Sequence, residues 1–126
     1  MNDVLIYQAQ VMRALANPRR LAILHALESG PREVGKLASL LAINQPSCSQ
    51  HLAAMAAVGI VEAMRDETDG RIVRYRLTDP AVMTACNIMH GVMTRQLERL
   101  SEAVISEPSL SETAASAASK TGDSSS

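Results

Sequence analysis

The chain has 126 residues, 47% of them apolar and only 2% aromatic, and its formal net charge is −1. This length supports one small domain, and a core without Phe or Trp must be built from Leu, Ile, Val, Ala and Met, which favours helices. A net charge near zero excludes a uniformly basic surface. Binding of a polyanion would therefore depend on where the basic residues lie.

Enzymes and membrane proteins are both disfavoured by the sequence. It contains no clustered acid–base pair and no glycine-rich phosphate loop, so we assign no catalytic residue. The two cysteines lack disulfide-type spacing, the N-terminus lacks the features of a signal peptide, and no apolar run approaches membrane-spanning length. We therefore expect a cytoplasmic protein that makes no membrane contact.

Apolar residues at helical spacing predict a first helix over about residues 3–15 and a second over residues 18–27. Asn17 is suited to cap the second helix, which has a proline in its first turn, and Gly30 ends it. The first helix has more apolar surface than a solvated helix needs, so we expect another surface to cover it.

The segment from Val34 to Val61 contains no Asp or Glu. It holds a third predicted helix, over about residues 33–41, and a fourth that Asn44 caps and Gly59 ends, which is typical of a helix-turn-helix. A surface that lies against phosphates cannot tolerate uncompensated negative charge. We expect the third helix to turn inward Val34, Leu37, Leu40 and Leu41. In the fourth we expect Cys48, Leu52, Met55 and Ala56 in the core, Ser47, Gln50 and Ala54 on the opposite side, and His51 at the boundary.

Two β-rich runs, IVEAM and RIVRYRL, flank the sequence DETDGR, in which Asp69 and Gly70 supply turn chemistry. They predict a hairpin that carries four arginines: Arg65, Arg71, Arg74 and Arg76. After it, Asp79 is suited to cap a last helix that runs to about Glu102. The apolar residues of this helix form a continuous line along one side: Val82, Cys86, Met89, Met93, Leu97 and Leu100.

Few other surfaces of so small a chain can cover that line, so we expect the first and last helices to pair with their copies in a homodimer. Residues 1–103 are then a DNA-binding and dimerisation domain. Residues 104–126 are rich in Ser and Ala, and we expect a disordered tail there.

The succession of ALANPRRLAIL, SQHLAAMAAVGIV and GRIVRYRL before a long helix resembles the ArsR/SmtB family of bacterial winged-helix repressors over roughly residues 5–100. The resemblance implies a mainly α winged helix-turn-helix fold with a small β-hairpin between the fourth and fifth helices. It also implies a homodimer that represses a nearby operon by binding operator DNA until an inducer, or a redox or metal signal, releases it.

This chain lacks the sensing residues that members of the family have at three known kinds of site. The two positions of a third-helix Cys-x-Cys metal pair hold Glu33 and Gly35. The last-helix metal site would retain Asp79, but its other positions fall near Ala81, Val92 and Arg95. The sulfide- and redox-sensing subgroup, to which SQHL and IMHGVM are most similar, has thiols where this chain has His25 and Thr94. The inducer is therefore not indicated. The turn of the motif also has Ala42 where Gly is common, which strains the turn if φ is positive.

A recognition helix reads bases near its N-terminus, so we expect base contacts from Gln45, Ser47 and Gln50. Ser49 and His51 are candidates for phosphate contacts, although His51 is equally suited to pack on the hairpin. On the hairpin, Arg71 is placed to reach a minor groove, and Arg65 and Arg74 to reach phosphates. The alternative is a solvated strand face that acidic residues partly neutralise: Asp66, Glu67 and Asp69.

Cys86 and His90 lie one turn apart on the last helix, and two such pairs in a dimer would offer a Cys2His2 site for zinc or another thiophilic ion. The alternative is that Cys86 packs at the subunit interface and His90 lies at its edge. Cys48 and Cys86 are the candidates for a redox response. Two other functions stay open: a winged-helix dimer that binds proteins and binds DNA weakly, and a DNA-binding regulator without a small ligand.

Overall fold

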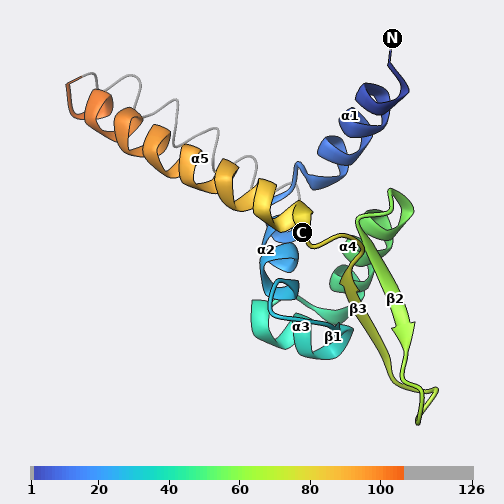
Figure 1. Ribbon diagram of the computed structural model, residues 1–126. Helices are drawn as coiled ribbons and strands as arrows, with labels where there is room; N and C mark the ends of the chain where they lie inside the picture. Colours follow the sequence, from blue (N-terminus) through green and yellow to red (C-terminus); the bar gives the residue numbers. More distant parts are fainter. Residues whose placement is uncertain (1, 107–126) are drawn as a thin grey trace. The chain divides into compact units, whose positions relative to one another are not determined.

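The computed structural model describes residues 2–106, and the side chains of residues 2–103. Its elements follow the order α1 (Asp3–Leu15), α2 (Pro18–Leu27), β1 (Arg32–Glu33), α3 (Val34–Leu41), α4 (Gln45–Ala57), β2 (Val61–Arg65), β3 (Val73–Leu77) and α5 (Ala81–Ser106) (Figure 1). The chain divides into two compact units, residues 1–82 and residues from 83 onward. The five predicted helices and the hairpin are confirmed, and the fold is a winged helix-turn-helix. The predicted tail lies almost wholly outside the described residues.

Asparagine side chains fix where α2 and α4 start. The Asn17 Oδ1 atom accepts the backbone N–H groups of Arg19 and Arg20 at 2.9 and 3.2 Å. At the start of α4, the Asn44 Oδ1 atom accepts the Ser47 N–H at 2.9 Å. Because the first N–H groups of a helix have no partner within the helix, such caps set its first residue. They explain why the predicted starts of these helices agree with the structure.

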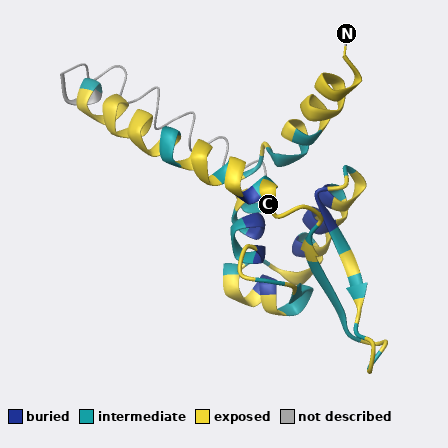
Figure 2. Cartoon of the chain, viewed as in Figure 1, coloured by how far each residue is buried: buried dark blue, intermediate teal, exposed yellow. Residues whose placement is uncertain are grey.

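The core of the first unit lies where α2, α3, α4 and the start of β2 meet, as the dark blue segments in Figure 2 show. Its fully buried side chains are Ile23, Leu24, Leu27, Leu37, Cys48, Leu52, Met55 and Val61. Two core predictions were wrong, because Leu40 is 58% exposed and Ala56 is also exposed. In α3 the inward stripe runs through residues 34, 37, 38 and 41, and this helical spacing turns Leu40 outward.

The turn between α3 and α4 places Ala42 in the left-handed region, with φ 54° and ψ 42°. The Ala42 N–H closes the last turn of α3 on the Ala38 and Ser39 carbonyls. An L-residue other than glycine is strained in this conformation, because its Cβ crowds the following carbonyl oxygen. The strain predicted from an alanine at position 42 is therefore present in the structure.

We expect Ala42→Gly to raise the free energy of unfolding by up to about 1 kcal/mol, since relief of strain exceeds the entropy that glycine adds to the unfolded chain. The matched control is Ala53→Gly in the interior of α4, which should lower it by about 1 kcal/mol. Urea denaturation of both variants measures the two free energies. A loss of stability in both would show that the turn is not strained.

The sheet is antiparallel and has three strands in the order β1-β3-β2. In the β2–β3 hairpin, which we call the wing (residues 61–77), Val61 lies opposite Leu77 and Arg65 opposite Val73. Figure 1 shows the wing extending away from α3 and α4, with its turn at the far end. The sequence did not predict β1, since a strand of two residues carries no alternating pattern. In β1, Arg32 and Glu33 pair with the edge of β3 that faces away from β2.

Candidate nucleic-acid interface

The outward face of α4 is polar and free of acidic residues. Gln45, Ser49 and Gln50 are exposed and Ser47 is half-buried, while Cys48 on the opposite side is fully buried. The Asn44 side chain already accepts the Ser47 N–H and Pro46 has no N–H, so the side chains of α4 rather than its first backbone N–H groups form this surface. The structure thus places Gln45, Ser47, Ser49 and Gln50 together at the surface, as the sequence predicted.

His51 is the exception among the residues predicted on α4. Its side chain is only 7% exposed, and its Nδ1 atom accepts a hydrogen bond from the Arg20 Nε atom at 3.1 Å. A buried imidazole cannot reach a phosphate, so that prediction was wrong. The alternative of internal packing agrees with this burial, and the hydrogen bond to Arg20 joins His51 to α2. Arg20 also donates from Nη1 to the Ala14 carbonyl at 2.9 Å, which gives this arginine an internal role.

Every arginine of the wing has an acceptor within the wing. Arg71 donates from Nε and Nη2 to the two oxygens of Asp69 at 3.1 and 3.2 Å, and Arg65 donates to the Gly70 carbonyl at 2.6 Å. The remaining two ion pairs join Arg74 to Asp66 and Arg76 to Glu62, each at 2.8 Å. The predicted neutralisation by Asp66 and Asp69 is therefore present, whereas Glu67 makes no ion pair in the part of the chain that the structure describes.

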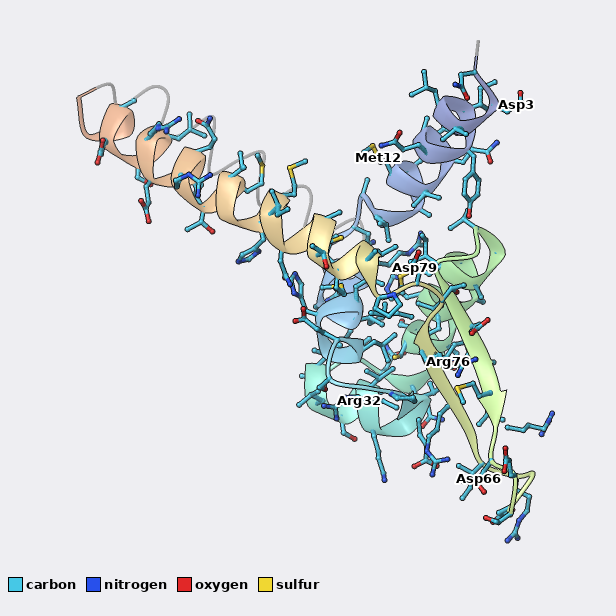
Figure 3. The ribbon with its side chains drawn as sticks, viewed as in Figure 1. Asp3, Met12, Arg32, Asp66, Arg76 and Asp79 are labelled. Carbon is cyan, nitrogen blue, oxygen red and sulfur yellow. The ribbon has the colours of Figure 1, made fainter. Side chains whose placement is uncertain are left out.

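Asp66 organises the turn of the wing, where Figure 3 labels it. Its Oδ1 atom accepts the Thr68 N–H at 2.8 Å, the Thr68 hydroxyl at 2.6 Å and the Asp69 N–H at 3.0 Å. The Thr68 and Arg74 hydrogen bonds hold the pKa of Asp66 far below its usual range, so the carboxylate is ionised at neutral pH. The sequence predicts that Asp69 and Gly70 form this turn, but Gly70 does not adopt a positive φ. The Asp-x-Thr spacing is the signal that would have identified the turn.

Arg74 belongs to the body of the wing rather than to its free surface. Its side chain is 38% exposed, and β1 places Glu33 directly opposite it on β3. Hydrogen bonding to Asp66 raises the pKa of Arg74. With two carboxylates beside it, this guanidinium is poorly placed for the predicted phosphate contact. Arg71, by contrast, has a 91% exposed side chain at the turn.

Both cysteines are free thiols, Cys48 buried in α4 and Cys86 half-buried in α5. Burial raises the pKa of each thiol, so both are protonated at neutral pH, whereas reactive sensor thiols have lowered pKa values. His90 lies exposed on α5, four residues after Cys86. Among the described residues, no three His, Cys, Asp or Glu side chains are grouped to hold a metal ion. No helix within residues 2–106 combines the length and apolarity that crossing a bilayer requires.

Residues 17–63 match the family model for bacterial regulatory proteins of the arsR family. The HTH-type transcriptional repressor SmtB of Mycobacterium tuberculosis is 40% identical over 77 residues, which cover 61% of this chain and 55% of that protein. The chain thus spans about half the length of this relative. The biofilm growth-associated repressor of Xylella fastidiosa is 31% identical over 88 residues, covering 70% of this chain and 75% of that protein.

Solved structures agree with this similarity. The solution structure of a homodimeric winged helix-turn-helix DNA-binding domain from Mycobacterium bovis, described as a possible ArsR-family regulator, matches with a TM-score of 0.67 and 33% identity. The match covers 79% of this chain and 93% of that domain. The family model and the Xylella relative, matched over 75% of its length, show that this chain belongs to the ArsR family of bacterial regulatory proteins.

Proposed function

We propose that this protein is a sequence-specific DNA-binding transcriptional repressor that acts as a homodimer. The observation that carries the proposal is the outward face of α4, which offers Gln45, Ser49 and Gln50 to solvent within a segment that has no acidic residue from Val34 to Val61. Relatives such as SmtB of Mycobacterium tuberculosis are named as transcriptional repressors, which supports the same role here.

Exposed apolar side chains on α1 support the homodimer. Val4, Leu5 and Met12 are 67, 55 and 56% exposed, although a monomer gains nothing by leaving them in water. Figure 3 shows Met12 extending from α1. Considered by itself, α5 also exposes apolar side chains: Ile88, Met89, Met93, Leu97 and Leu100. The homodimeric state of the Mycobacterium bovis domain is consistent with pairing through these two helices.

We assign different roles to the surface residues of α4 and the wing. Gln45, Ser47 and Gln50 read base edges in the major groove, because amide and hydroxyl groups can both donate and accept hydrogen bonds there. Ser49 and Arg65 contact phosphates, and Arg71 enters a minor groove. We withdraw His51 and Arg74 from the DNA contacts. His51 is buried, and Arg74 is paired with Asp66 and lies opposite Glu33 in the sheet. We assign no inducer, metal or redox role.

Selection of duplexes from a random-sequence pool by the purified chain tests the proposal. We expect a recurrent motif with two related half-sites, because a two-fold dimer presents two copies of α4. Affinity for the selected duplex should fall steeply as salt rises, since each neutralised phosphate adds about 0.9 to the slope of log affinity against log salt. No recurrent motif, or affinity that does not change with salt, would reject DNA recognition and favour a protein-binding module.

The proposal also predicts that Asp69 weakens the wing as a DNA contact. Its two oxygens occupy the Arg71 guanidinium in the fork geometry that a phosphate would otherwise take. Asp69→Asn should tighten binding of the selected duplex about two- to fivefold at low salt, the range expected for one exposed ion pair. An amide oxygen can still accept the Arg71 N–H, now bonded at 3.1 Å, so the turn is kept.

The matched control is Glu67→Gln, which removes the same charge from the same turn but no ion pair of the described residues. Fluorescence anisotropy of labelled duplex compares the two variants with the parent chain. In an Arg71→Ala background the gain from Asp69→Asn should vanish. Equal gains from both charge removals would mean that Asp69 acts only through general repulsion.

A further inference from the structure

The side chain of Tyr7 on α1 bonds to the C-terminal end of α4. The Tyr7 hydroxyl donates a hydrogen bond to the carbonyl oxygen of Val58, which is 51 residues later in the sequence and caps the C-terminal end of α4. Tyr7 is 49% exposed, and no residue of α1 is fully buried. The position of α1 therefore depends on a few specific contacts of this kind more than on a packed core.

The C-terminal end of α4 is shaped to receive this hydroxyl. Gly59 adopts φ +79°, and the Ile60 N–H bonds back to the Met55 carbonyl at 3.1 Å, an arrangement typical of a glycine-terminated helix. A Cβ atom at position 59 would lie only 3.0 Å from the Tyr7 hydroxyl oxygen. Glycine thus serves two purposes here, because it supplies the backbone conformation and leaves room for Tyr7.

A second link joins the other end of α1 to the middle of α4. Arg20 donates from one nitrogen to the Ala14 carbonyl in the last turn of α1 and from another to the buried His51. Residues 7 and 14 are about 10 Å apart along a helix. Two links at that separation fix the direction of α1 relative to α4, whereas a single link would fix only a distance.

The opposite side of α1 is the one proposed to meet a second subunit. At about 100° per residue, Leu5 and Met12 point about 160° and 140° away from Tyr7. Both side chains are more than half exposed. One helix would then carry the subunit interface on one side and the recognition helix on the other. This step rests on the proposed function, which supplies the homodimer and the DNA.

We infer that Tyr7 is a positioning residue that sets the orientation of α4 relative to the dimer axis, and thereby the separation of DNA half-sites that the dimer accepts. Half-site spacing is a geometric property of a dimer, because two recognition helices must enter grooves a fixed distance apart. Tyr7 itself contacts no DNA in this scheme.

The test compares Tyr7→Phe with the parent chain on the selected duplex and on duplexes whose half-sites are one base pair closer or farther apart. The substitution removes one hydroxyl group and keeps the ring. We expect the parent chain to prefer one spacing clearly. For Tyr7→Phe we expect binding at that spacing to weaken about three- to tenfold. The ratio of affinities between the preferred spacing and the other two should fall to less than half of its value in the parent chain.

Tyr75→Phe on β3 is the matched control, since the Tyr75 hydroxyl makes no hydrogen bond in the described part of the chain. It should leave the spacing preference unchanged. Sedimentation should show the same dimer for all three proteins. A parent chain without paired half-sites would overturn the proposed function and this inference with it. A clear parental preference that Tyr7→Phe retains, or equal weakening at every spacing, would overturn the inference alone.

Discussion

Replacing Gln50 by glutamate is expected to weaken binding of the selected duplex about tenfold to a hundredfold. Gln50 is exposed on the outward face of α4, a helix without acidic residues. The change removes an amide that can pair with a base edge, which is worth about 1 to 3 kcal/mol, and it brings a carboxylate toward phosphates. Circular dichroism should show unchanged folding, because the side chain lies outside the core. Gln50→Ala should weaken binding less and should mainly change the preferred base.

The matched control places the same substitution on another exposed helical residue, Gln10→Glu on α1. It changes the net charge equally but lies far along the chain from α4. Anisotropy titrations at two salt concentrations should therefore separate a local effect at the interface from a general effect of charge. Similar losses for both variants would show that α4 does not face the duplex.

Replacing Leu37 by alanine is expected to lower the free energy of unfolding by about 3 kcal/mol. The Leu37 side chain has no exposed surface, so truncation leaves a cavity in the core between α3 and its neighbours. Such a loss is a large part of the stability of a small domain. Denaturation by urea, monitored by circular dichroism, measures the change.

Leu40→Ala tests the same substitution in the same helix, one turn later, where the side chain is 58% exposed. Its effect should stay within about 0.5 kcal/mol, because little apolar area leaves water on folding there. The pair also tests the corrected register of α3. Equal losses at the two positions would restore the prediction that Leu40 faces inward.

Features encoded by local sequence were predictable, because neighbouring residues determine them. The starts of α2 and α4 follow from Asn17 and Asn44, whose side chains bond to N–H groups only two or three residues away. The wing follows from two β-rich runs and a polar turn. The acid-free outward face of α4 could also be predicted, since helical spacing separates it from Cys48 and Leu52.

Features that depend on distant residues were not predictable from periodicity. His51 has the spacing of a boundary residue, but it is buried and bonds to Arg20, 31 residues earlier. The Tyr7 hydrogen bond joins residues still farther apart. For α3, eight residues are too few for periodicity to separate Leu40 from the true inward stripe. The DNA contacts themselves stay predictions.

The short strand β1 restricts how the wing can move. Glu33 pairs with Arg74 of the wing, and the next residue, Val34, begins α3, so no linker separates the sheet from the helix-turn-helix. The wing and the helix-turn-helix should consequently move together as one rigid body. A duplex whose grooves do not match the fixed positions of α4 and the wing would have to bend or twist. The protein would then favour operators that are easily deformed, even at base pairs that no side chain touches.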